Sequence, residues 1–117
     1  MNEDNDVAVL EPMVRPEKKA KSATNPKILP PYVVIVYNDN DHTFQYVIIT
    51  FQKVFGYSLE RAAALAETIH REGRAVVWQG SKEVAELKVE LIKSAGPDPY
   101  ANKRVDWPLH AEIEPMT

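Results

Sequence analysis

The chain has 117 residues, no cysteine and a formal net charge of -3. This length suggests one domain plus a tail, and the lack of cysteine excludes disulfides, thiolate metal sites and cysteine nucleophiles. The charge gives no reason to expect nucleic-acid binding. Because no apolar run could span a membrane and the start does not resemble a signal peptide, we expect a soluble cytoplasmic protein.

Residues 1–29 show the features of a tail. Acidic residues give way to basic ones, prolines are interspersed, and no periodicity is sustained. We therefore expect a flexible N-terminal extension over residues 1–29 and a folded core domain over residues 30–115. The alternative is that a partner grips part of this extension.

A buried strand is expected over residues 33–37, where five apolar or aromatic residues follow one another and four are β-branched. The polar run Asn38–Asp41 ends this strand, because short polar side chains favour turns. Thr43 can cap a helix whose apolar face holds Val47, Phe51, Val54 and Phe55. Carboxylates, amides and an imidazole thus gather where a strand meets a helix, which suits a small positively charged ligand.

A second helix is expected from Leu59 to Glu72, capped by Ser58 and ended by Gly73. Its broad inner face can include Ala62, Leu65, Ala66, Ile69 and His70. A short strand over residues 75–78 follows it. Four alanines in this helix would allow close approach to a neighbour.

Ser81 is expected to cap a third helix that extends to about Ala95. We expect its inward face to hold Val84, Leu87, Leu91 and Ile92, with its charged residues solvated, Glu83 and Lys88 among them. A long loop over residues 96–107 should follow, and residues 108–113 alternate weakly as in a last edge strand. The order β-α-α-β-α-β indicates an α+β domain of two layers, a three-stranded antiparallel sheet with three helices on one face.

Simple catalytic or metal motifs are missing from the sequence. Asp39, Asp41 and Thr43 match the first positions of a calcium loop, but Phe44 and Thr50 stand where that loop needs Gly and Glu. The three histidines lack zinc-site spacing, and no phosphate loop or nucleophile motif is present. We therefore expect no metal, no cofactor and no enzymatic activity. Taken alone, His70 would be interpreted as a packing or capping residue.

Several stretches together resemble ClpS, the bacterial N-degron adaptor of the Clp protease. The resemblance covers about residues 31–114 and is carried by Tyr37-Asn38-Asp39-Asn40, Gln52-Lys53-Val54-Phe55, Ile69-His70-Arg71-Glu72-Gly73-Arg74-Ala75 and Ser81-Lys82-Glu83-Val84-Ala85-Glu86-Leu87-Lys88. It implies that Asn38 and His70 accept hydrogen bonds from the free α-amino group of a peptide, with negative charge from Asp39 nearby.

The same resemblance implies a pocket for the first side chain of the peptide. Its lining would be Asn40, His42, Phe44, Val47, Ala66, Ile69 and Leu109. The implied substrates begin with Phe, Trp, Tyr or Leu. His42 stands where Thr or Asn is usual, and Phe44 and Ala66 stand where Met commonly gates the pocket, so the preference for a first residue stays open.

Glu83 and Lys88 match the family's docking surface for the N-terminal domain of a ClpA- or ClpC-type AAA+ unfoldase. The resemblance implies a monomer with no nucleic-acid or membrane partner. Two alternatives remain. One is a ClpS-like interaction module that docks on an AAA+ or ribosomal partner without N-degron selectivity, and the other is a small metal-dependent hydrolase.

Overall fold

A computed structural model describes residues 29–116, so the predicted extension lies outside the described residues except for Leu29. The elements follow the predicted order β-α-α-β-α-β. They are β1 (Tyr32–Tyr37), α1 (Phe44–Phe55), α2 (Leu59–Glu72), β2 (Arg74–Gly80), α3 (Lys82–Lys93) and β3 (Ala111–Pro115). The predicted α+β class is therefore confirmed.

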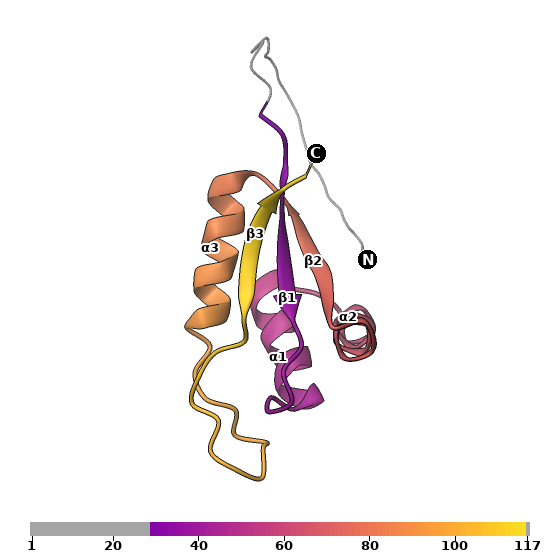
Figure 1. The fold of residues 1–117 in the computed structure, drawn as a ribbon, viewed down its shortest axis with the longest axis vertical. Helices are drawn as coiled ribbons and strands as arrows, with labels where there is room; N and C mark the ends of the chain where they lie inside the picture. The colour runs from indigo at the N-terminus through magenta and orange to yellow at the C-terminus, as the bar shows by residue number, and fades with distance from the viewer. Residues whose placement is uncertain (1–28, 117) are drawn as a thin grey trace.

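The sheet has β1 in its centre, with β2 and β3 antiparallel on its two sides. α3 contacts all three strands, α2 contacts β2, and α1 packs against α2 and α3. Figure 1 shows α3 alongside the sheet and α1 and α2 near the end of the sheet at which β1 finishes. This is the predicted arrangement of a three-stranded sheet with three helices.

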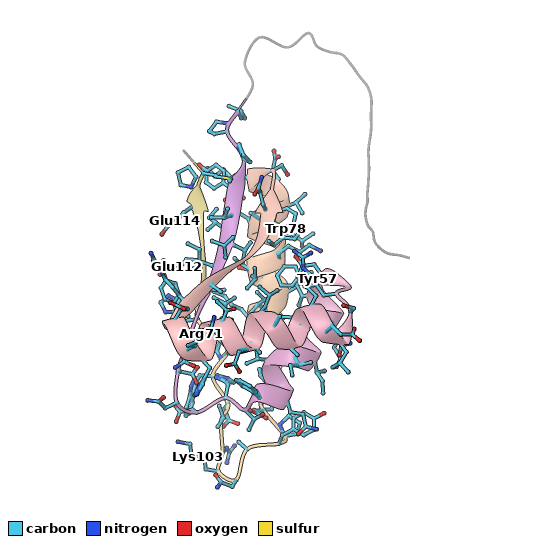
Figure 2. The ribbon with its side chains drawn as sticks, turned by 90° about the vertical axis from the view of Figure 1, so that its right-hand side faces the viewer. Tyr57, Arg71, Trp78, Lys103, Glu112 and Glu114 are labelled. Carbon is cyan, nitrogen blue, oxygen red and sulfur yellow. The ribbon has the colours of Figure 1, made fainter. Side chains whose placement is uncertain are left out.

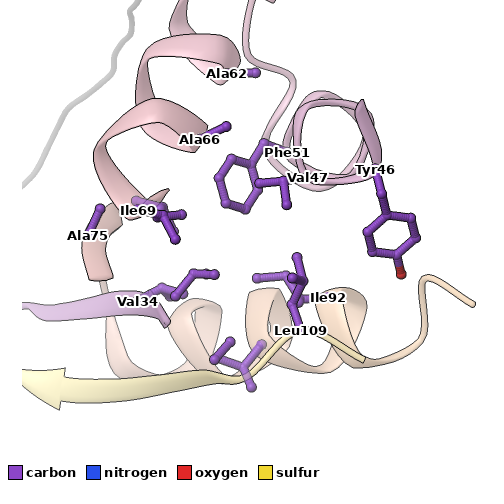
Figure 3. Packing of buried hydrophobic residues seen from close by; sticks show 14 of the residues in the cluster. Val34, Tyr46, Val47, Phe51, Ala62, Ala66, Ile69, Ala75, Ile92 and Leu109 are labelled. Carbon is purple, nitrogen blue, oxygen red and sulfur yellow. The ribbon is translucent and has the colours of Figure 1, made fainter. Parts of the chain in front are cut away.

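The main core lies between the sheet and the helices. Val34 and Val36 of β1 belong to it, together with Phe51 of α1 and Ala66 of α2. Figure 3 shows the side chains of Phe51 and Ala66 directed into the space enclosed by the helices and the sheet. Because strand side chains alternate between faces, the neighbours of Val34 point the other way, yet they are also buried. The predicted burial is thus confirmed for Val33, Val34, Ile35 and Val36, whereas Tyr37 at the end of the predicted run is only half-buried.

Each helix begins at a residue whose side chain accepts a backbone N–H of the first turn, which satisfies a donor that the helix itself leaves free. These N-caps are Thr43, Ser58 and Ser81, all as predicted. α2 ends at Gly73, whose φ of 93° lies in the left-handed region that favours glycine. The chain can therefore turn at once from α2 into β2.

The inward face of α3 differs from the prediction in all but Ile92. Ile92 is buried as predicted, but its buried neighbours are Ala85 and Val89, whereas Val84, Leu87 and Leu91 are exposed. Residues 85, 89 and 92 lie on one face of the helix at i, i+4 and i+7. The larger apolar residues 84, 87 and 91 form a second stripe beside this face. Ala85 is 0% exposed, so a larger side chain at this position would meet atoms already in place.

The last strand and the loop before it also differ in their boundaries. β3 begins at Ala111 rather than at residue 108, because the pairing of β1 with β3 ends at Val36 and Ala111. Before this pair, His110 O accepts the Tyr37 N–H at 3.0 Å. Figure 1 shows the loop between α3 and β3 extending past α1. Asp98 and Val105 are buried within this loop.

Candidate functional site

One cavity of about 400 Å³ is lined by all ten residues that the sequence predicted for peptide binding. It lies between the end of β1, the turn that follows, the first turns of α1 and the last turns of α2. The lining residues are Val36, Tyr37, Asn38, Asp39, Asn40, His42, Phe44, Val47, Ala66, Ile69, His70 and Leu109. Val36 and Tyr37 were not predicted, because a strand run read from sequence does not show which end faces a cavity.

Asn38 and His70 are held at one cavity by the way in which β1 and α2 end. The Asn38 N–H donates to Gly73 O at 2.9 Å, and this bond ties the turn after β1 to the turn after α2. His70 lies in the last turn of α2, three residues before Gly73. Within residues 29–116, neither side chain makes a hydrogen bond, and both are exposed. Two polar groups at this end of the cavity are therefore free to accept a donor.

Asp39 organises the turn at the mouth of the cavity. Its Oδ1 accepts the N–H groups of Asp41 and His42, each at 2.8 Å, and its Oδ2 lies 2.7 Å from His42 Nδ1. Burial raises the pKa of Asp39, but the hydrogen bonds from His42 and Asp41 together lower the pKa by a larger amount. The net effect holds the pKa of this carboxyl below its ordinary value, so Asp39 is an anion near neutral pH.

His42 lies between the turn and the loop that precedes β3. Its Nδ1 faces Asp39, and its Nε2 lies 2.8 Å from Trp107 O. The ring stacks on Tyr46 with centroids 5.0 Å apart, and its side chain is 1% exposed. The imidazole thus forms part of the cavity wall and joins two segments far apart in the sequence.

The floor of the cavity is apolar and well packed. Val47, Ala66, Ile69 and Leu109 are each less than 9% exposed, and Figure 3 shows Val47 of α1 and Ala66 of α2 directed into the same apolar space. Phe44 is 45% exposed and meets the edge of His70, with ring centroids 5.5 Å apart. An apolar floor beside two free polar groups can bind a ligand that has an apolar side chain and a hydrogen-bond donor close to it.

The loop over residues 96–107 is attached to the N-terminus of α1 by several hydrogen bonds. Asp98, which is 5% exposed, accepts the Thr43 N–H at 2.7 Å and the Thr43 hydroxyl at 3.1 Å. The Tyr46 hydroxyl donates to Gly96 O at 2.5 Å. Lys103 pairs with Asp41, and Figure 2 shows Lys103 at the tip of the loop. Sequence reasoning missed Asp98, because the only local signal is a turn-forming Gly-Pro-Asp-Pro run.

The two residues predicted for docking lie on α3 and do not line the cavity. Glu83 is exposed in the first turn of α3. Lys88 is not solvated as predicted, because its Nζ donates to Val54 O at 2.9 Å at the end of α1 and lies 5.8 Å from the Phe55 ring centre. Burial lowers the pKa of Lys88. Lys88 therefore holds α3 against α1 in addition to any role in docking.

Other candidate features contain none of the predicted residues. A smaller cavity of about 290 Å³ lies between α1, the end of α3 and residues 97–100. Within residues 29–116, no three histidine or acidic side chains lie close enough to hold a metal ion. Over the same range, every helix is too short or too polar to cross a bilayer.

Comparison with known proteins supports one family. The family model described as ATP-dependent Clp protease adaptor protein ClpS matches residues 27–100. The ClpS adapter protein of Mycobacterium marinum is 42% identical over 76 residues, which are 65% of this chain and 75% of that protein. The ClpS adapter protein of Mycolicibacterium paratuberculosis is 38% identical over 91 residues, 76% of this chain and 87% of that protein.

A solved structure shows the same fold with a small ligand. It is Agrobacterium tumefaciens ClpS2 bound to L-phenylalaninamide, which superposes with a TM-score of 0.62 at 28% identity. The alignment covers 76% of this chain and all of that chain. Its ligand carries a free amine and a phenyl side chain.

Proposed function

Since this chain belongs to the ClpS family of adaptor proteins of the ATP-dependent Clp protease, we propose that it binds the N-terminal residue of N-degron substrates at the cavity described above. It then delivers them to a Clp-type AAA+ unfoldase. The observation that carries this proposal is the placement of the free polar groups of Asn38 and His70 at the rim of an apolar cavity.

The polar end of the cavity suits a free α-amino group. Such an amine has a pKa of about 8 and is mostly an ammonium ion near neutral pH, with three donors and no acceptor. The amide oxygen of Asn38 and a neutral ring nitrogen of His70 are acceptors, and the Asp39 carboxylate adds negative potential at the mouth. An acetylated N-terminus offers one donor and no charge, so the site discriminates against it.

The apolar end of the cavity suits a bulky first side chain. Burying a Leu or Phe side chain contributes about 1.5–3 kcal/mol, and a cavity of about 400 Å³ can accept one. Neither this burial nor the amine contacts alone overcome the cost of association. Together they select peptides that have both a free amine and an apolar first residue, and we propose Phe, Trp, Tyr and Leu.

Delivery requires a second surface that stays free while a peptide is bound. α3 offers one, because Glu83 and the exposed side chains of Val84 and Leu87 lie away from the cavity lining. We propose that this face, with Lys88 at its border, docks on the N-terminal domain of a ClpA- or ClpC-type unfoldase.

The proposal is tested by fluorescence anisotropy with a peptide that begins with Phe and its acetylated copy. We expect the free peptide to bind and acetylation to abolish most of the binding. His70→Ala should weaken binding of the free peptide, whereas His110→Ala, which removes an exposed histidine outside the cavity lining, should not. Equal curves for the free and acetylated peptides would overturn the proposal and favour an interaction module without N-degron selectivity.

A further inference from the structure

We propose that His42 is a positioning residue that carries a proton on both ring nitrogens and so ties the amino-group-binding turn to the segment that carries Leu109. The inference rests on the proposed function and deepens it. It explains how the part of the pocket wall that contains Leu109 is held in place.

Both ring nitrogens of His42 face groups that can only accept. Nδ1 lies 2.7 Å from a carboxylate oxygen of Asp39, and Nε2 lies 2.8 Å from the carbonyl oxygen of Trp107. A neutral imidazole has one N–H donor and one acceptor, so it can make only one of these two bonds. The imidazolium form makes both. At these distances an unprotonated nitrogen would direct its lone pair at an oxygen.

Water cannot relieve that conflict, because the His42 side chain is 1% exposed. Tyr46 covers one side of the ring, and the Trp107 ring meets it edge-on with centroids 6.4 Å apart. A buried polar atom left without a partner is costly. A buried imidazolium, in contrast, is stabilised here by a carboxylate in direct contact.

The other charged groups around His42 have partners of their own. Asp41, in the same turn, pairs with Lys103 of the loop. Asp98 is bonded to Thr43 and to the Tyr100 N–H. The remaining loop charges, Arg104 and Asp106, pair with each other at 2.6 Å. Asp39 is therefore the counter-charge of His42, and its other oxygen is already held by two backbone N–H groups.

The clasp formed by Asp39, His42 and Trp107 sets the pocket wall. Leu109 lies two residues after Trp107, across Pro108, whose ring restricts the backbone between them. Fixing the Trp107 carbonyl therefore fixes the direction in which Leu109 enters the cavity. Loss of the clasp should loosen this wall and weaken selection of bulky side chains, while Asn38 and His70 keep their contacts with the amine.

The protonation state is tested by NMR on the 15N-labelled full chain without peptide. The His42 ring, assigned by comparison with the His42→Asn spectrum, should show two protonated nitrogens at pH 7, and in Asp39→Asn it should show one. A bare ring nitrogen on His42 at pH 7 would overturn the proposal. Because no peptide is present, this outcome is separate from any failure of the proposed function.

The positioning role is tested by a peptide panel. We expect His42→Asn to lower affinity for a peptide that begins with Phe about tenfold, the scale of one lost charge-assisted hydrogen bond, and to lower affinity for one that begins with Ala far less. Both peptides should stay sensitive to acetylation. His42→Gln, which keeps more of the volume, guards against a folding defect that circular dichroism would reveal. Unchanged Phe-over-Ala selectivity in both folded variants would refute the positioning role.

Discussion

At the scale of single residues, the site depends on which acceptors remain free after the turn has folded. The carboxylate of Asp39 already accepts hydrogen bonds from two backbone N–H groups and contacts the His42 ring. Within residues 29–116, the side chains of Asn38 and His70 make no hydrogen bond. Negative charge and accepting capacity are thus divided between different residues. We therefore propose that the amine of a ligand is bound by the free acceptors of Asn38 and His70, and that the Asp39 carboxylate contributes negative potential nearby.

Asp39 should make stability depend on acid. Burial raises the pKa of Asp39, but its hydrogen bonds outweigh this effect and hold the pKa below its ordinary value in the folded state. The ionised form therefore stabilises the fold fully at any pH above the ordinary pKa of the carboxyl. This contribution is lost as the pH falls through the lowered pKa. In urea unfolding between pH 2 and 6, Asp39→Asn should lower the free energy of unfolding at pH 6 and flatten its decline in acid. Glu90→Gln, which removes the same charge from an exposed side chain, is the control, and parallel profiles for all three proteins would contradict this expectation.

Ala66 should determine how strictly the pocket rejects β-branched first residues. It is 2% exposed on the cavity floor, and Phe44 at the rim is too rigid to fill the space that a longer side chain would occupy. We expect the wild type to prefer aromatic first residues over Leu and to tolerate Ile and Val. Ala66→Met should restore a preference for Leu and weaken Ile binding by about 1 kcal/mol or more.

The measurement is a panel of peptides beginning with Phe, Trp, Leu, Ile and Val titrated against both proteins. If the wild type already prefers Leu and excludes Ile, Phe44 or the wall at Leu109 closes the pocket, and Ala66 does not control it.

At the scale of elements, local chemistry was predictable from the sequence and long-range partners were not. Helix starts followed from Thr43, Ser58 and Ser81, because an N-cap acts on N–H groups three residues away. The inner face of α3 was predicted correctly only at Ile92, because two apolar stripes lie side by side on this helix and only tertiary packing decides which of them is buried. The role of Asp98 was invisible, since its partner Thr43 lies 55 residues earlier.

The loop should contribute to stability through Asp98. Replacing Asp98 with Ala leaves the partly buried Thr43 N–H and hydroxyl without their acceptor, so we expect a loss of about 1–3 kcal/mol in the free energy of unfolding. Urea titration followed by circular dichroism measures this loss. Asp106→Ala, which removes an exposed loop carboxylate, should cost much less. Equal losses in the two variants would contradict the role assigned to Asp98.

Two variants of α3 should distinguish an effect on docking from an effect on stability. Glu83→Lys changes an exposed charge and should impair delivery of a substrate to the unfoldase, with peptide affinity and stability kept. Lys88→Glu should impair both delivery and stability, because it removes the ammonium that Val54 O accepts. A degradation assay with purified unfoldase and protease, paired with thermal melts, distinguishes the two. A stable Lys88→Glu variant would show that the contact with α1 is dispensable.

At the scale of the whole molecule, the described residues form one folded unit around the cavity. The cavity is lined by the end of β1, the turn after it, residues of α1 and α2, and Leu109. Among residues 29–116, no lining residue precedes Val36. We propose that residues 30–115 are the core domain and residues 1–29 an extension.

Removing residues 1–25 should therefore leave peptide binding intact. We expect the truncated protein to melt at the same temperature and to bind a Phe-initiated peptide with wild-type affinity. Calorimetric titration and thermal denaturation of both forms provide the comparison. Loss of peptide affinity on truncation would place the domain boundary earlier than residue 30.

The bond from the Asn38 N–H to Gly73 O has a consequence for quality control. It joins the ends of β1 and α2, so the two acceptors for an amine meet only when sheet and helices have docked. A copy in which the sheet and the helices have not docked would not bring these two side chains together. On heating, peptide binding should therefore be lost at the same temperature as tertiary structure. Only the fully folded protein would then bind a substrate.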